Sequence, residues 1–361
     1  MSDFLTAFSD DYFEARDKFL FAARVAGAKV KSVAHPLPAP NGETIHMDIA
    51  EYGPDDAQTG VLIVAGVHGP EAYCGSGIQI QMLRSPEIMA KYADVKLIFV
   101  HGHNPYGWAW CRRVDENNID INRNYVDFSK PYSVNKDYKL VQHLFMPDDF
   151  DEAAEQAIYD WIAEHGQKKF ATTAMVGQRI DENGLFYGGL RPSWTNQTFR
   201  REVLPLLAPQ KKALLIDLHT GLGDYADGII LHVYPKDSPR AKMFNKWYDN
   251  KVDGGMDVLD NDKVDYENSG STVASFESFY PDKDTCAMVV EYGTGDLSKI
   301  LMALIKDNWL HVKGDLDSAK GKAIKKELLH MLYPNTEEWK TGVWKHASWV
   351  LDKTAEHIGA L

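Results

Sequence analysis

A histidine and a glutamate, three residues apart, follow an apolar run in the first quarter of the chain. His68 and Glu71 belong to the glycine-rich stretch GVHGPEAYCGSG, which spans residues 66–77 and comes directly after VLIVA. Imidazole and carboxylate groups are ligands that zinc uses in proteins. Because His-x-x-Glu pairs are also common on protein surfaces, this pair becomes informative only together with other residues of suitable type.

Two such residues accompany apolar runs further along the chain. His219 ends the run ALLIDLH, and Glu291 follows CAMVV. Ligands in open α/β sheets gather at the carboxyl ends of strands, so we expect these residues to meet His68 and Glu71 there. Two histidines and a carboxylate form a catalytic zinc site, and Glu291 could act as general base on its water. The alternatives are a structural histidine and a strand-end carboxylate in a salt bridge.

The segment between these positions is rich in arginine and asparagine. It contains a predicted turn at 104–107 (NPYG), the pair Arg112 and Arg113, and the run DINRN at 120–124. Buried guanidinium groups need a partner or an anionic ligand, such as a carboxylate or the oxyanion of a scissile carbonyl. Neighbours on an extended segment face opposite ways, so we expect only one arginine to face the metal. We favour Arg113 because it is nearer the Asp-x-Asn-Arg motif. The alternative is a polar loop with surface arginines.

In chain order, these motifs resemble the pattern of the zinc carboxypeptidase superfamily. That pattern runs His-x-x-Glu, Asn-Pro-x-Gly, an arginine, Asp-x-Asn-Arg-Asn, a single histidine and a late glutamate, and the match covers roughly residues 60–295. The short interval from Arg113 to Asn122 and the Asp-Leu-His run at 217–219 look like the aspartoacylase and succinylglutamate desuccinylase side. The stretches GLFYGGLRPSWTN (184–196) and DLHTGLGDYADG (217–228) resemble a branch of unassigned function.

The resemblance implies a metal site and two catalytic residues. His68, Glu71 and His219 would bind Zn²⁺, one ion per chain. Glu291 would activate the attacking water and pass its proton to the leaving amine. Arg113 would polarise the scissile carbonyl and stabilise the oxyanion.

The resemblance also implies two carboxylates that support the metal ligands. Asp120 would accept the second ring N–H of His68 and so fix the tautomer of that imidazole. Asp217 lies two residues before His219, and on a strand the two side chains share a face. Asp217 is therefore a candidate for a similar role, with a purely structural carboxylate as the alternative.

A substrate with a free carboxylate follows from the same resemblance. Asn122 and Arg123 would bind this carboxylate, and Arg112 and Tyr187 are further candidates for substrate contact. The substrate would be a small peptide or an N-acyl amino acid.

Two features of the family pattern have no clear match in this chain. Carboxypeptidases have a mobile tyrosine before the catalytic glutamate, and neither Tyr266 nor Tyr280 has a matching spacing. Side-chain specificity would come from the segments 225–232, 266–280 and 184–194. Acidic residues there or nearby could favour a basic substrate or could simply be surface residues: Asp224, Asp227 and Asp265.

The sequence leaves several functions open. A carboxypeptidase and an aspartoacylase-like N-acyl amino acid deacylase both fit the motifs, because each acts beside a free carboxylate. A non-catalytic carboxylate-binding protein is an alternative of another class. A serine hydrolase is a third candidate, but the chain has no Gly-x-Ser-x-Gly motif, and helix capping explains Ser76 in CGSGIQI.

The apolar runs and the segments between them predict an α/β fold. Runs that suit strands buried on both faces lie at 61–66, 95–102, 213–221, 228–234 and 286–293. Helical spacing marks the segments 10–28, 74–92, 151–166, 195–207, 237–251 and 296–311. We therefore expect a central, mostly parallel mixed sheet with helices on both faces, preceded by a hairpin or edge strands at 35–54.

The chain has no Pro/Gly/Ser-rich linker, so we expect one catalytic domain over residues 1–361. Its core would span about 55–312, with an insertion of loops and a helix pair at about 127–195. A helical extension at about 313–361 would pack on the outside.

Composition restricts the partners and the location. A net charge of −13 disfavours nucleic acids and anionic membranes. Three cysteines do not form a disulfide framework, and no run has the length of a membrane span. The acidic N-terminus lacks the features of a signal peptide, so we expect a soluble, cytoplasmic protein. The sequence does not reveal the oligomeric state.

Overall fold

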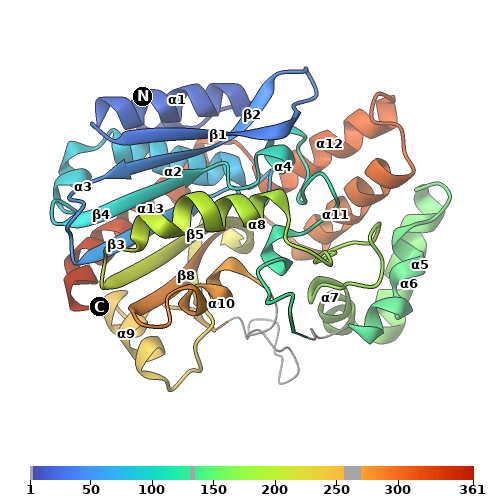
Figure 1. Cartoon of the computed structure of the whole chain (residues 1–361). Coiled ribbons are helices and arrows are strands. Elements are labelled where there is room, and N and C mark those ends of the chain that lie inside the picture. Colours follow the sequence, from blue (N-terminus) through green and yellow to red (C-terminus); the bar gives the residue numbers. More distant parts are fainter. Residues whose placement is uncertain (1–2, 131–134, 256–269) are drawn as a thin grey trace.

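A single sheet organises the chain. The computed structural model describes residues 3–130, 135–255 and 270–361, and within them eight strands form a sheet in the order β1-β2-β4-β3-β5-β8-β6-β7 (Figure 1). The four central strands are parallel and fall on predicted apolar runs: β4 (Val95–His101), β3 (Thr59–Ala65), β5 (Lys212–Tyr225) and β8 (Asp284–Gly293). The predicted α/β class with a mostly parallel mixed sheet is confirmed.

The edges of the sheet contain its antiparallel pairings. β1 (Lys29–Pro38) and β2 (Thr44–Tyr52) form the predicted hairpin, and β2 runs antiparallel to β4. At the other edge, β6 (Gly228–His232) runs antiparallel to β8, and β7 (Gly254–Gly255) pairs parallel with β6. The parallel centre therefore keeps the carboxyl ends of its four strands together.

Helices cover both faces of the sheet. Along β3, Val61 and Ile63 belong to one apolar cluster and Leu62 and Val64 to another, because side chains alternate between the faces of a strand. The first cluster includes side chains of α1 (Tyr12–Val25), α2 (Ala72–Leu83), α3 (Pro86–Ala90), α9 (Pro239–Trp247) and α13 (Glu337–His357). The second includes side chains of α8 (Trp194–Thr198) and α10 (Thr272–Ser275).

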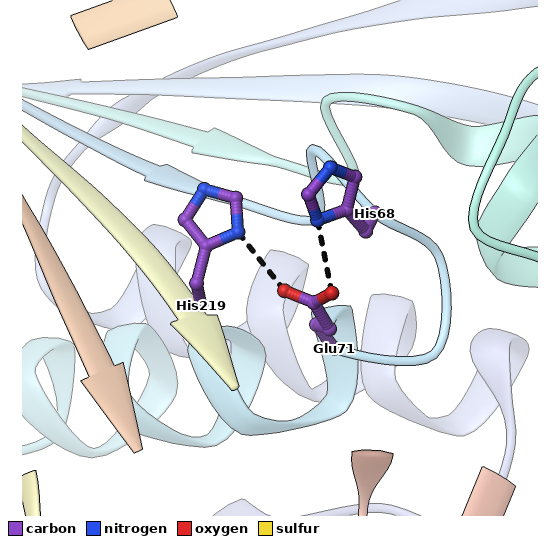
Figure 2. Close-up of side chains that lie close together, drawn as sticks. All are labelled: His68, Glu71 and His219. Carbon is purple, nitrogen blue, oxygen red and sulfur yellow. Dashed lines mark hydrogen bonds and ion pairs between the residues drawn. The ribbon is translucent and has the colours of Figure 1, made fainter. Parts of the chain in front are cut away.

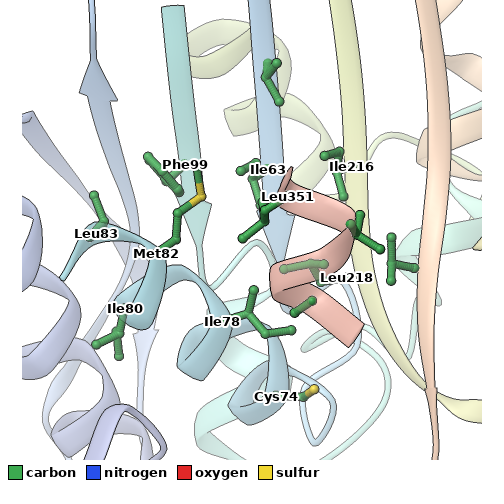
Figure 3. Packing of buried hydrophobic residues seen from close by; sticks show 14 of the residues in the cluster. Ile63, Cys74, Ile78, Ile80, Met82, Leu83, Phe99, Ile216, Leu218 and Leu351 are labelled. Carbon is green, nitrogen blue, oxygen red and sulfur yellow. The ribbon is translucent and has the colours of Figure 1, made fainter. Parts of the chain in front are cut away.

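The C-terminal helix α13 belongs to the layer that buries the sheet. Figure 3 shows Leu351 of α13 and Ile78 of α2 over Ile63 and Ile216 of the central strands. Trp339 is fully buried, and its indole N–H donates to the carbonyl of Gly293 at 2.9 Å. The C-terminal segment thus packs on the sheet, because its apolar face covers strands that would otherwise be exposed.

A third apolar cluster joins the segment 127–195 to two later helices. The described part of this segment contains no strand beyond an isolated bridge between Gln178 and Tyr187. Its helices are α5 (Gln142–Phe145), α6 (Glu152–His165) and α7 (Gln167–Met175). They share the cluster with α11 (Leu297–Val312) and α12 (Ala319–Leu332). The expected helix pair is present as α6 and α7.

Several predicted elements differ locally from the observed ones. The helix expected over 74–92 breaks before Pro86, since a proline disfavours helical backbone in the residue that precedes it. The helix expected over 195–207 is α8 followed by a π-helical and a 3₁₀ turn. The predicted turn at 104–107 is the start of α4 (Pro105–Ala109), which Asn104 caps through the amide of Gly107. No helix within the described ranges is long and apolar enough to cross a membrane.

Candidate metal centre

His68 and Glu71 are held by a tight turn between β3 and α2. Gly66 has a φ of +84°, in the left-handed region that favours glycine. A Cβ atom on Gly69 would lie 2.0 Å from the carbonyl oxygen of Gly107, so the turn can approach this segment only with glycine there. The turn therefore places the imidazole and the carboxylate at the carboxyl end of β3.

His219 reaches the same place from β5. Its Nδ1 lies 2.9 Å from Oε2 of Glu71, and Nδ1 of His68 lies 2.9 Å from Oε1 (Figure 2). One ligand atom from each residue lies within 4.8 Å of the others, and all three side chains are buried. Two imidazoles and a carboxylate at this spacing fit the ligand set of a zinc ion with an open position.

A carboxylate lies behind each imidazole. Nε2 of His68 is 3.3 Å from Oδ1 of Asp120. Nε2 of His219 is 3.1 Å from Oδ2 of Asp217, an ion-pair separation without hydrogen-bond alignment. A ring whose Nε2–H points to a carboxylate keeps the Nδ1 lone pair for a metal. The structure thus places both predicted supporting carboxylates beside the two histidines.

The charges in this buried region are strongly coupled. Burial alone would raise the pKa of the Glu71 carboxyl, but His68 and His219 hold it below its ordinary value. Burial would likewise raise the pKa of Asp120, yet Arg113 and His68 hold it well below the usual range. For His219, burial opposes the charged form, but Asp217 and Glu71 raise its pKa well above normal. A buried set with this excess of carboxylates favours a bound cation.

Of the two neighbouring arginines, Arg113 faces the candidate metal centre. Its Nε donates to Oδ2 of Asp120 at 3.1 Å, and its Nη1 lies 3.4 Å from Oε1 of Glu71. Its guanidinium also lies over the ring of Phe186, 5.0 Å from the centroid. Phe186 is buried and has a φ of +54°, an uncommon conformation for a bulky residue, at the point where it supports this arginine.

Glu291 enters the same cavity from β8. It is the register partner of His219 on the neighbouring strand, and its Oε2 accepts a hydrogen bond from the amide of Leu222 at 3.4 Å. Burial raises the pKa of Glu291 to about 7. A carboxylate in such a buried position is a candidate to accept and return a proton.

The two residues expected to bind the substrate carboxylate also line the cavity. Oδ1 of Asn122 accepts from the amide of Thr272 at 3.1 Å, so its amide nitrogen is the polar atom available to a ligand. Arg123 donates instead to main-chain carbonyls, at 2.6 Å for Met175 and 3.1 Å for Val176. Its guanidinium therefore holds the wall of the cavity, a structural contact that the sequence did not predict.

Arg112 and Tyr187 do not join this group. Both line a separate cavity, and Nη2 of Arg112 donates to Oδ1 of Asn118 at 2.8 Å. The expectation of substrate contact at this centre is corrected for both residues. These loops turn so that the chain neighbours Arg113 and Phe186 line the metal cavity instead, and Phe186 does so with a left-handed backbone.

The walls of the metal cavity are largely apolar. The cavity has a volume of about 120 Å³. Apolar side chains from α7, α11 and α12 line it, namely Met175, Leu297, Ile300, Leu301, Leu304 and Leu332. The sequence contains no motif at these positions. Only the helical spacing at 296–311 predicted the helix that supplies most of these residues.

The predicted specificity segments supply fewer residues to the wall of the metal cavity than expected. Leu231 and Phe186 line the cavity, whereas Asp224 and Asp227 are exposed and do not. The hydroxyl of Tyr280 donates to the carbonyl of Leu204 at 2.6 Å, away from the centre. Two further candidates, Asp265 and Tyr266, lie outside the described residues.

Comparisons with known proteins place these observations in context. No curated protein matches the chain. Similar solved structures include bovine thrombin-activatable fibrinolysis inhibitor, in complex with tick carboxypeptidase inhibitor, at 10% identity and a TM-score of 0.45, covering 97% of this chain and 99% of that one. Carboxypeptidase A from Helicoverpa armigera is 12% identical with a TM-score of 0.45, covering 94% of this chain and 73% of that one. Metallo-carboxypeptidase from Burkholderia cenocepacia is 13% identical with a TM-score of 0.39, covering 94% of this chain and 70% of that one.

These values describe a distant likeness of chain path. One family model matches residues 8–346, nearly the whole length of the chain. The chain therefore belongs to the family described as "Protein of unknown function (DUF2817)".

Proposed function

We propose that this chain is a zinc-dependent hydrolase that cleaves an amide bond next to a free carboxylate. The observation that carries the proposal is the convergence of His68, Glu71 and His219 on one point in a cavity that Arg113 and Glu291 also line. Zinc bound there would act as a Lewis acid on the scissile carbonyl and would lower the pKa of water.

The protein's own groups then perform the proton transfer and stabilise charge. Glu291 accepts a proton from the attacking water and gives it to the leaving amine, a role for which its place in the cavity beside the metal residues suits it. Arg113 donates to the carbonyl oxygen as negative charge develops on it. Asp120 already holds that guanidinium at 3.1 Å, so little reorganisation is needed during the reaction.

The substrate's carboxylate would lie at the Asn122 end of the cavity. The amide nitrogen of Asn122 donates to it there, because the amide oxygen is already bound by Thr272. The positive charge of Arg123, which lines the same cavity, favours an anionic group even though its N–H groups hold main-chain carbonyls.

A specific observation supports the deacylase form of this activity beside the carboxypeptidase form. The cavity is small, about 120 Å³, and α11 and Leu332 form part of its wall. A short N-acyl amino acid fits such a volume more readily than an extended peptide.

Hydrolysis assays with zinc-loaded protein test the proposal. The substrates are N-acetyl amino acids, dipeptides with a free carboxylate, and the C-terminal amides of both as matched controls. We expect cleavage of the free acids, little cleavage of the amides, loss of activity with a chelator and recovery with added zinc. Full turnover after complete removal of metal would refute the mechanism, and zinc binding without any turnover would support a carboxylate-binding protein.

The structure gives no support to a serine nucleophile at Ser76. This residue lies inside α2, is 1% exposed, and its Oγ is 2.9 Å from Nε2 of His101. The capping role expected from the sequence is wrong, since α2 begins four residues earlier. Ser76 lines neither the metal cavity nor the second cavity, so a substrate in either has no contact with it.

A further inference from the structure

A second cavity, of about 570 Å³, lies beside the segment that carries Arg113. Arg112, residues 116–119, part of the segment 182–191 and the last turn of α11 line it, and it shares no lining residue with the metal cavity. At two places, residues adjacent in sequence line different cavities. Arg113 and Phe186 line the first, whereas Arg112 and Tyr187 line the second.

Arg112 is the feature of this cavity that calls for a ligand. It is 5% exposed, and among the described residues its Nε has no hydrogen-bond partner. Its Nη2 donates to the neutral amide of Asn118, and Asp115 and Asp307 act on its charge without an ion pair to it. Burial lowers the pKa of this guanidinium despite the nearby negative charges. The neighbours therefore do not compensate for the hydration that the buried group has lost. An anionic group that entered the cavity would pair with it.

The same cavity also presents negative charge. Its carboxylates are Glu116 and Glu182, and Arg191 adds a second guanidinium to Arg112. Glu116 already contacts Nε2 of His35 at 3.3 Å, whereas Glu182 is exposed. Because the cavity carries both signs of charge, a ligand that also carries both signs matches it. The apolar part of the wall comes from Ile119, Tyr187, Leu190 and Val312.

We propose that the second cavity binds a free amino acid with an apolar side chain. The carboxylate of the ligand pairs with Arg112, its ammonium group pairs with Glu182, and its side chain lies against Tyr187 and Ile119. No residue of the metal centre takes part, so the proposal stands or falls independently of the proposed hydrolysis.

A crystal soaked with L-4-bromophenylalanine locates the site directly, because the bromine gives an anomalous signal. The crystal is grown from the full chain with a chelator present, so that the amino acid cannot bind to zinc. We expect bromine in the second cavity and the ligand's carboxylate on Arg112. Bromine found only in the metal cavity, or nowhere at saturating concentration, overturns the proposal. This test requires no variant.

Calorimetric titration of the metal-free protein with the same amino acid tests the assigned contacts. Arg112→Gln should weaken binding by about 10- to 100-fold, the loss of a charged hydrogen-bonded pair, while Arg24→Gln on the exposed face of α1 should not. The wild-type protein should prefer the free amino acid to its N-acetyl derivative, and Glu182→Gln should remove that preference. Equal affinity of the wild-type and Arg112→Gln proteins would overturn the proposal.

Discussion

His219 and Glu291 stand directly opposite each other on the neighbouring parallel strands β5 and β8. Residues paired in this way point to the same face and edge of a sheet, so the strand register alone brings a candidate metal ligand beside a candidate base. Burial raises the pKa of Glu291 to about 7 in this position. The relationship links the fold to the proposed chemistry without any intervening loop.

Glu291→Gln is expected to lower kcat by about 10²- to 10⁴-fold, because the amide keeps the shape of the side chain but cannot accept the proton. Zinc content, measured by elemental analysis, should stay at the wild-type level. Glu164→Gln, an exposed residue of α6, is the matched control and should keep full activity. Normal turnover by Glu291→Gln would remove this residue from the mechanism.

The stability of the metal-free protein should depend on pH through the same residue. The folded state raises the pKa of Glu291 from 4.5 to about 7, which favours the neutral acid. The resulting stabilisation is fully present below about pH 4.5 and is lost as the pH rises through about 7. We expect the unfolding free energy of the wild type to fall by about 1–3 kcal/mol relative to Glu291→Gln between about pH 5 and 8. Urea unfolding with a chelator measures the difference, and parallel pH profiles would contradict it.

His219→Ala should abolish zinc binding, because it removes one of the two Nδ1 atoms that converge on Glu71. Zinc at about 100 times its Kd should stabilise the wild type by about 3 kcal/mol and raise its Tm, but should leave the Tm of the variant unchanged. His165→Ala, at an exposed position in α6, should respond as the wild type does. A variant that still bound one zinc ion per chain would show that the ligand set is different.

Arg113→Lys and Arg112→Lys make the same change in neighbouring residues. Lysine cannot contact Asp120 and Glu71 in the way the planar guanidinium does, so Arg113→Lys should lower kcat/KM by about 10²- to 10³-fold. Arg112→Lys should change it little, since Arg112 lines the second cavity. Steady-state kinetics of both variants provide the test, and the reverse order of effects would mean that Arg112 serves the reaction.

Much of the fold and part of the site could be predicted from local patterns. Apolar runs bounded by turn residues predicted the central strands, because strands buried on both faces carry few polar side chains. The rule that ligands gather at the carboxyl ends of parallel strands predicted the meeting of His68 and His219, which are 151 positions apart in the sequence. The nearness of Arg113 to the Asp-x-Asn-Arg motif favoured it over Arg112 as the residue that faces the centre, and it lines the metal cavity whereas Arg112 does not.

The sequence by itself determined the residue types that can bind a metal, the strands that carry them and the order in which they occur. Only the tertiary structure decided what surrounds them. Arg123 holds the main chain at Met175 and Val176, α11 supplies apolar wall residues, and α13 covers the sheet. These contacts join segments distant in sequence, and each depends on how whole helices pack, which no local spacing of residues encodes.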